Sequence, residues 1–93
     1  MSNTDYAGTL TEEAARAALT DFLELRTKHV WEPATDLFES GAVTSIFAME
    51  LVVHVEQTFG VTIEGDELTM ENFRTIDAMV AMVFRLKAGA RRG

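Results

Sequence analysis

Ser45 is the residue of this chain whose type and position are best suited to chemistry. It opens an apolar stretch that continues to Phe59, so we expect it in the first turn of a helix. Free backbone N–H groups and the positive end of the helix dipole make such a turn a favourable place for a phosphate. Ser45 is therefore a candidate for covalent modification.

Catalysis by Ser45 itself would need a general base within hydrogen-bond reach of its hydroxyl. His54 comes nine residues later, which places it about 13 Å along a helix axis and on the opposite side. His29 is the other histidine, and its neighbours Lys28 and Val30 supply no orienting carboxylate. We therefore expect a protein without intrinsic catalysis rather than an enzyme.

Metal ligands are sparse in this sequence. There is no cysteine, and two isolated histidines do not provide the ligand set of a zinc site. The acidic residues between Glu64 and Glu71 lack the alternating oxygen ligands of a calcium-binding loop, so we interpret them as helix-start acids and solvated charges. No metal is predicted.

Charge is distributed unevenly along the chain, whose formal net charge is −7. Between Val30 and Phe73 there is no Lys or Arg. The acids of that stretch are Glu32, Asp36, Glu39, Glu50, Glu56, Glu64, Asp66, Glu67 and Glu71. Such a field repels nucleic acid and steers basic protein surfaces toward Ser45. The simpler alternative is a solubilising surface.

Helical segments must hold Ser45 in place. A first helix is expected over residues 11–27, a second from Ser45 to Thr58, a short helical piece within residues 64–73, and a last helix from Ile76 to about Lys87. Gly60 ends the second helix, Thr75 caps the last one, and Thr9 or Thr11 caps the first. The core-facing residues of the first helix are expected to be Ala14, Ala18, Phe22 and Leu25. The core-facing residues of the last helix are expected to be Ile76, Met79, Val80 and Val83.

These helices predict an all-α fold in one domain over residues 11–87. A long loop, residues 29–44, joins the first two helices and is anchored by Trp31, Leu37 and Phe38. Residues 1–10 are expected to be a flexible N-terminus, and residues 88–93 a flexible basic tail. No apolar run is long enough for a membrane span and no secretory signal is evident, so we expect a monomeric cytoplasmic protein.

The second helix has more apolar surface than one core contact requires. One stripe is expected to face the core and consists of Ala48, Leu51, Val52, Val55 and Phe59. A second stripe of Ile46, Met49 and Val53 lies on another face, beside Ser45. This second stripe is either additional core or a partly exposed docking patch.

The segment around Ser45 resembles the modification-site helix of acyl carrier proteins. Thr44-Ser45-Ile46 corresponds to their D-S-L motif, Met49-Glu-Leu-Val52 to a V-E-L-V type helix, and Phe59-Gly-Val-Thr-Ile63 to a closing F-G-x-x-I. The resemblance implies a four-helix bundle with a short third helix and a long loop between helices one and two. It implies that residues 11–87 are an acyl carrier domain and that Ser45 is esterified by 4′-phosphopantetheine. The terminal thiol of that group carries an acyl chain as a thioester.

The resemblance also implies partners: a phosphopantetheinyl transferase, an acyl-loading enzyme and downstream synthase enzymes. Glu50 and Glu56 flank the second stripe, so basic partner surfaces are expected to contact these acids while the apolar patch is desolvated. The predicted docking residues are Thr44, Ile46, Phe47, Met49, Glu50, Val53 and Glu56.

Two departures from the family pattern concern partner choice. Thr44 replaces the usual aspartate, although it can still cap the helix, and Phe47 stands where an acid is common. Phe47 is expected either to contact a particular partner or to pack against the loop of residues 33–44.

Residues 38–46 and 71–75 look most like discrete carriers of unusual polyketide extender units such as methoxymalonyl, in antibiotic or related secondary-metabolite biosynthesis. An aminoacyl, peptidyl or D-alanyl carrier is the alternative within the family. The alternative outside it is a helical interaction module in which Ser45 is only a helix cap.

Overall fold

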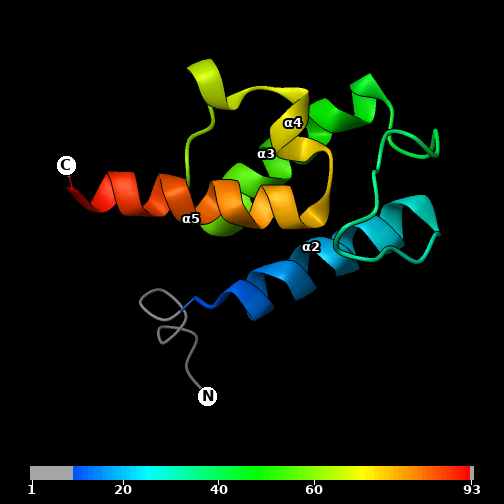
Figure 1. Cartoon of the computed structure of the whole chain (residues 1–93), viewed down its shortest axis with the longest axis horizontal. Coiled ribbons are helices and arrows are strands. Elements are labelled where there is room, and N and C mark those ends of the chain that lie inside the picture. The colour runs from blue at the N-terminus through cyan, green and yellow to red at the C-terminus, as the bar shows by residue number, and fades with distance from the viewer. Residues whose placement is uncertain (1–9, 93) are drawn as a thin grey trace.

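The computed structural model describes residues 10–92, and all of their regular structure is helical. The elements are α2 (Glu12–Thr27), α3 (Ser45–Phe59), the 3₁₀ turn η1 (Gly65–Glu67), α4 (Met70–Phe73) and α5 (Ile76–Arg92). Figure 1 shows α5 crossing the molecule, with α2 on one side of it and α4 on the other. The predicted all-α fold with a short third helix is confirmed. Of the expected flexible N-terminus, residues 1–9 lie outside the described residues.

The predicted helix ends are set by the expected capping groups. The Thr11 hydroxyl accepts a hydrogen bond from the Ala14 N–H at 3.0 Å, and the Thr75 hydroxyl accepts one from the Ala78 N–H at 2.9 Å. Gly60 ends α3 in the left-handed conformation, with φ of 68°, and its N–H donates to the Glu56 carbonyl. Side-chain oxygens and a positive-φ glycine therefore fix where these helices begin and end.

The last helix is longer than predicted. It continues to Arg92, so residues 88–92 are helical rather than an irregular tail, and Gly93 lies outside the described residues. The reason is that Ala and Arg favour helix while the single glycine, Gly89, is tolerated inside one. The Lys87 ammonium also donates to the Phe59 carbonyl at 2.9 Å, which joins this part of α5 to the end of α3.

The inward face of α2 also differs from the prediction. Ala15, Leu19 and Leu23 are fully buried, whereas Leu25 is 68% exposed and Ala14 is exposed. The helix has two apolar sets at helical spacing, about 100° apart, and the set with two leucines occupies the core. The predicted Ala18 and Phe22 lie at the edge of this face, where they are partly buried.

The core forms where α2 and α4 pack on α5 and α3 adds its first stripe. Leu51, Val55 and Phe59 of that stripe are buried, and so are all four predicted residues of α5. The complete buried set is Ala15, Leu19, Leu23, Trp31, Leu37, Val43, Leu51, Val55, Phe59, Ile63, Phe73, Ile76, Met79, Val80, Met82 and Val83. Among residues 10–92 no helix has the length and hydropathy that a membrane span requires.

The long loop before α3 is tied to the start of α5. The Leu37 N–H donates to the Arg74 carbonyl at 2.8 Å, and the Asp77 N–H donates to the Pro33 carbonyl at 3.0 Å. Trp31 and Leu37 are buried as predicted, and Phe38 packs on the core while remaining partly exposed. These contacts fix the path of the loop and therefore the position at which α3, and with it Ser45, begins.

Candidate functional site

Ser45 is the first residue of α3, and its side chain is exposed. The residue that caps the helix is Thr44, whose hydroxyl accepts a hydrogen bond from the Phe47 N–H at 3.2 Å. The interpretation of Ser45 as only a helix cap is therefore wrong, because the neighbouring threonine already performs that role. Within the described residues no hydrogen bond engages the Ser45 hydroxyl.

The electrostatics at this helix start favour an anion. The first turn of α3 contains no acidic side chain, in contrast to α2, which begins with Glu12 and Glu13. The positive end of the α3 dipole is thus not compensated by the helix's own first turn. A phosphoester on Ser45 would lie next to the backbone N–H groups of the first turn of α3.

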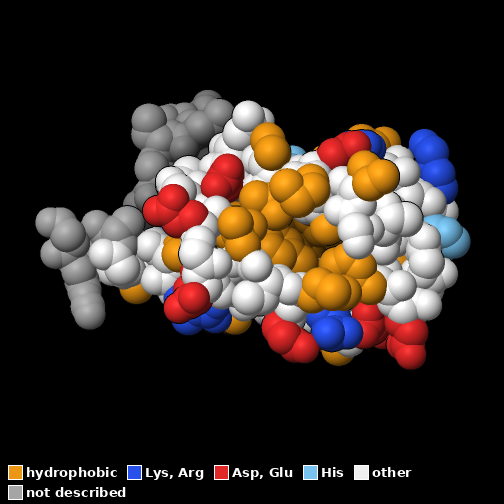
Figure 2. Space-filling view, turned by 90° about the horizontal axis from the view of Figure 1, so that it is seen from above, with side chains coloured by type: hydrophobic (Ala, Val, Ile, Leu, Met, Phe, Trp, Pro, Cys, Tyr) orange, Lys and Arg blue, Asp and Glu red, His pale blue; other side chains and the backbone are white. Residues whose placement is uncertain are grey.

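An apolar pocket of about 200 Å³ opens beside Ser45. Its walls come from the loop, from α3 and from the segment that contains η1 and α4. They consist of Phe38, Ser45, Ala48, Met49, Val52, Leu68, Thr69, Met70 and Phe73. Figure 2 shows hydrophobic side chains gathered around a hollow on this face of the molecule. Sequence reasoning missed the pocket walls outside α3, although the hydrophobic residues of the 64–73 segment were a signal for them.

The second apolar stripe of α3 is exposed rather than additional core, and its docking role stays a prediction. Ile46, Met49 and Val53 are 80%, 65% and 49% exposed. Leu68 and Met70, on the opposite side of the pocket, are also exposed hydrophobic residues. Large apolar side chains in water near one pocket are typical of an interaction surface.

Phe47 packs on the hydrophobic core and contacts α2. Its ring stacks near that of Phe22 on α2, with centroids 6.1 Å apart, and the Arg26 guanidinium lies 5.1 Å from its centroid. An aromatic residue at this position adds a contact between α2 and α3 that an acid would not make. Phe47 is partly buried, and its docking role stays a prediction.

The two acids predicted to flank the stripe have partners within the fold. Glu50 forms an ion pair with Arg26 of α2, and both side chains remain nearly half exposed. Glu56 accepts a hydrogen bond from the Ile63 N–H at 2.8 Å and is partly buried. Glu56 therefore also supports the chain where it leaves α3.

Arginines from outside the acidic stretch form ion pairs with its carboxylates, although the stretch itself contains no Lys or Arg. Arg74 pairs with Asp36 and Glu71, and Arg85 pairs with Glu67. Glu67 lies in the first turn of η1, as predicted for a helix-start acid, and it also accepts a hydrogen bond from the Asn72 amide at 3.1 Å. The negative field around the pocket is thus reduced at particular side chains.

The pKa of Asp36 illustrates this local compensation. The Asp36 carboxylate accepts hydrogen bonds from the Glu39 N–H at 3.0 Å and the Phe38 N–H at 2.9 Å. The Glu39 N–H is the main cause that lowers the pKa of this carboxyl below its usual value. Burial opposes it, and Arg74 and the Phe38 N–H lower the pKa further.

The histidines lie apart from Ser45. His54 faces α2 and stacks on Phe22, whereas Ser45 faces the pocket near α4, as the predicted opposite placement requires. Burial, assisted by the Arg26 charge, lowers the pKa of His54. His29 lies near Trp31, with ring centroids 5.9 Å apart.

Comparison with known proteins agrees with this geometry. Residues 13–83 match the family described as the phosphopantetheine attachment site. The chain belongs to the acyl carrier protein family. It is 41% identical over 59 residues to a probable acyl carrier protein, PigG, of Serratia sp. (strain ATCC 39006), a match that covers 63% of this chain and 68% of that protein.

The prosthetic group of this carrier domain is 4′-phosphopantetheine, held covalently. The matched residues include Ser45, the whole of α3 and every residue that lines the pocket. The site suits the group because an exposed hydroxyl, a helix start without acidic side chains in its first turn and an apolar pocket lie together. When bound, the group supplies a terminal thiol on a flexible arm.

Proposed function

We propose that this carrier holds an acyl group as a thioester on 4′-phosphopantetheine attached to Ser45. The observation that carries the assignment is the exposed Ser45 hydroxyl at the start of α3, beside the apolar pocket. The chain's own contribution is to present this hydroxyl, to stabilise the phosphoester at the helix N-terminus and to offer a surface to other enzymes. Chemistry on the acyl group is left to those enzymes.

Intact-mass measurement tests the attachment site. The protein is incubated with coenzyme A and a phosphopantetheinyl transferase of broad specificity, and we expect a single addition. Ser45→Ala should prevent it. Ser40→Ala is the matched control, because Ser40 is also an exposed serine of the same region, and its hydroxyl donates to the Leu37 carbonyl at 3.3 Å. Addition to the Ser45→Ala protein would overturn the assignment.

The pocket supports a small and uncharged group as the part of the cargo that the protein shelters. Its lining is apolar apart from Ser45 and Thr69, and none of the lining residues is charged. An ammonium of an aminoacyl or D-alanyl group would lose water there without gaining a partner. We therefore favour a short acyl chain over the aminoacyl, peptidyl or D-alanyl alternative.

For the pathway we propose an extender-unit or starter carrier of polyketide or related secondary-metabolite biosynthesis. The support is the likeness of residues 38–46 and 71–75 to such carriers. A malonyl-type cargo such as methoxymalonyl would keep its carboxylate outside the pocket, since no cation lines it. Loading with propanoyl and methoxymalonyl groups, followed by methyl spectra of Met49 and Met70, tests this. Propanoyl should shift both signals, and methoxymalonyl should shift them less.

The proposed partners are the transferase, an acyl-loading enzyme and downstream synthase enzymes, each approaching with a basic surface. Support comes from the exposed stripe of Ile46, Met49 and Val53, with Glu50 nearby on the same helix. Thr44, Phe47 and Glu56 complete the proposed docking set, Glu56 in addition to its contact with Ile63. Rim acids of this kind steer association, while the apolar centre slows dissociation.

A further inference from the structure

Arg74 lies between α4 and α5 and joins two separate parts of the chain. One guanidinium nitrogen donates to Asp36 of the long loop at 3.2 Å, and another donates to Glu71 of α4 at 3.0 Å. Thirty-eight residues separate Arg74 from Asp36 in the sequence. The side chain therefore connects the loop before Ser45 to the short helix after η1.

Asp36 links the Arg74 side chain to the backbone of Phe38. The oxygen of Asp36 that does not contact Arg74 accepts the N–H groups of Phe38 and Glu39 at 2.9 and 3.0 Å. A carboxylate that bonds the backbone two and three residues later fixes the local turn. The position of Phe38 is thus coupled to the carboxylate that Arg74 holds.

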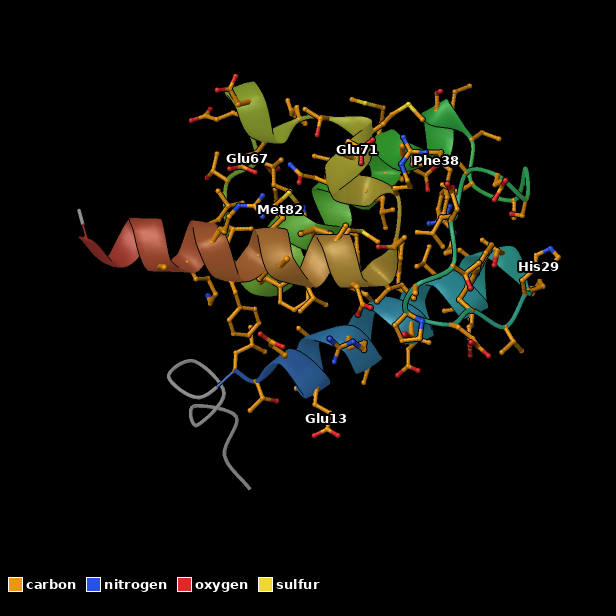
Figure 3. All side chains as sticks on the ribbon, in the orientation of Figure 1. Glu13, His29, Phe38, Glu67, Glu71 and Met82 are labelled. Atoms are coloured by element: carbon orange, nitrogen blue, oxygen red, sulfur yellow. The ribbon has the colours of Figure 1, made fainter. Side chains whose placement is uncertain are left out.

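The loop and α4, which Arg74 joins, both contribute residues to the pocket beside Ser45. Phe38 forms the wall on the loop side, and Met70 and Phe73 of α4 form the wall opposite α3. Figure 3 labels Phe38 and Glu71, which belong to the two elements that Arg74 joins. Glu71 lies next to Met70 in a helix of only four residues, so a constraint on one acts on the other.

A helix of four residues depends on outside contacts for its position, because one turn is not stable alone. At its start, the Asn72 amide donates to the Glu67 carbonyl at 2.8 Å, and Arg85 of α5 contacts Glu67 and Asn72. These bonds attach α4 to α5. The guanidinium bonds of Arg74 attach it to the loop, in addition to the backbone bond from the Leu37 N–H to the Arg74 carbonyl.

We propose that Arg74 is a positioning residue that, through Asp36 and Glu71, fixes the separation of the Phe38 and α4 walls and so sets how closely the pocket encloses a short acyl chain near Ser45. This inference rests on the proposed function for its acyl chain, while the effect on the walls is a property of the unmodified protein. Exposed ion pairs contribute little to global stability, so we expect the Arg74 side chain to affect the position of the pocket walls but not the stability of the whole fold.

The fold is expected to survive the loss of the side chain. The Leu37 N–H donates to the backbone carbonyl of Arg74, and this bond does not need the guanidinium. Arg74→Ala should therefore fold and leave the pocket walls less constrained. Arg74→Lys keeps the charge but cannot bridge two carboxylates in the same planar manner, so its pocket walls should be less constrained than in the wild type and more constrained than in Arg74→Ala.

The first test uses the unmodified protein with ¹³C-labelled methionine methyl groups. Met49 and Met70 line the pocket, whereas Met79 and Met82 are fully buried elsewhere in the core and serve as internal references. Arg74→Ala should shift the Met70 and Met49 signals and reduce hydrogen-exchange protection of the Phe38 and Glu39 amides. Asp36→Asn should shift the same signals, and the double variant should add little, since both changes break one connection.

Arg16→Ala is the matched control. Arg16 pairs with Asp77 at 2.9 Å, its side chain is 33% exposed compared with 38% for Arg74, and neither partner lines the pocket. This variant should leave Met49, Met70 and the Phe38 amide unchanged. Equal effects of Arg16→Ala and Arg74→Ala on these signals would overturn the proposal.

The second test uses protein that carries a butanoyl thioester. A free thiolate attacks the thioester carbonyl, the acyl group passes to it, and the sulfur of the arm leaves as a thiolate that takes up a proton from water. Arg74→Ala should accelerate this exchange by about two- to fivefold relative to the wild type and to Arg16→Ala, the range expected when its two exposed ion pairs, with Asp36 and Glu71, are lost. Unchanged exchange and unchanged methionine signals, in a folded variant, refute the role of Arg74.

The two hypotheses fail in different ways. If Ser45 takes up no prosthetic group, the proposed function fails, and the methionine spectra of the unmodified protein still decide whether Arg74 positions the walls. If Ser45 is loaded but Arg74→Ala changes neither spectra nor exchange, only the positioning role fails.

Discussion

The imidazole of His54 lies parallel to the ring of Phe22, with centroids 3.7 Å apart and planes 10° apart. This stack joins α3 to α2, and Arg26 lies 5.5 Å from the Phe22 centroid. Burial in this contact, assisted by Arg26, lowers the pKa of His54 from its ordinary value of 6.5. The unfolded chain therefore takes up a proton more readily than the folded one.

The free energy of unfolding should consequently fall as the pH drops below about 6.5 and through the lowered pKa of His54, and the full contribution is present above that window. Thermal melting from about pH 7 to about pH 5 should show this decline, and His54→Gln should show a shallower one. Asp36, whose pKa is lowered from 3.8, loses its contribution only at more acidic pH. Parallel declines in the two proteins would exclude His54 as the titrating group.

Thr44 and Ser45 should respond differently to the same substitution. Thr44→Ala removes the cap on the Phe47 N–H and should lower the free energy of unfolding by about 1 kcal/mol. Ser45→Ala should change it by less than about 0.5 kcal/mol, because its hydroxyl is exposed and without a hydrogen-bond partner among the described residues. Chemical denaturation of both variants measures the difference. A larger loss for Ser45→Ala would show that Ser45 has a structural role.

Local signals in the sequence were sufficient for the parts of the fold that neighbouring residues determine. Thr11, Thr75 and Gly60 act within one helical turn of themselves, so the predicted caps were confirmed. Periodicity also separated the two apolar stripes of α3, although it left open whether the second stripe was additional core or exposed. The acyl carrier family followed from the register of several short motifs around Ser45.

Features that depend on contacts between distant residues were not predictable in the same way. Ala14 and Ala15 begin equally plausible apolar sets, and packing against α5 selects the second. The pocket needs Phe38 of the loop and Phe73 of α4 to line the same hollow beside α3, and no periodicity relates them. The ion pair between Asp36 and Arg74 was likewise not predictable, because Asp36 lies in a stretch without Lys or Arg and its partner lies 38 residues later in the sequence.

Lys28 offers a route to a more stable protein. It is the C-cap of α2 and has φ of 63°, a left-handed conformation that costs a residue with a Cβ about 1 kcal/mol relative to glycine. Lys28→Gly should therefore raise the free energy of unfolding by about 0.5 to 1 kcal/mol. Urea denaturation with an unchanged slope would measure this gain.

Gly60→Ala is the matched control for that prediction. Gly60 caps α3 with φ of 68°, and a Cβ added there meets no atom within 4 Å, so the substitution tests backbone strain without a steric clash. The unfolding free energy should fall by about 1 kcal/mol. If Gly60→Ala is neutral, the left-handed conformation is not costly at these caps and the gain from Lys28→Gly has another cause.

The docking surface is best tested by separating charge from apolar contact. Arg26→Gln should free Glu50 from its ion pair and raise the rate of phosphopantetheinyl transfer at low salt, whereas Glu50→Gln should lower that rate. Both effects should shrink at high salt, because screening acts on exposed charges. Circular dichroism checks that the loss of the Arg26 contacts with Phe22 and Phe47 leaves the helices intact.

Met49→Ala should slow transfer at every ionic strength, since Met49 is 65% exposed and its burial against a partner does not depend on salt. Transfer rates of the three variants across a salt series provide the measurement, with Leu25→Ala as the control for an exposed hydrophobic residue on α2, where it is 68% exposed. Leu25→Ala should be neutral. If Met49→Ala and Glu50→Gln are neutral as well, α3 is not the docking surface, and the acidic segment from Glu64 to Glu71 becomes the surface to examine, because Leu68 and Met70 are exposed beside its acids.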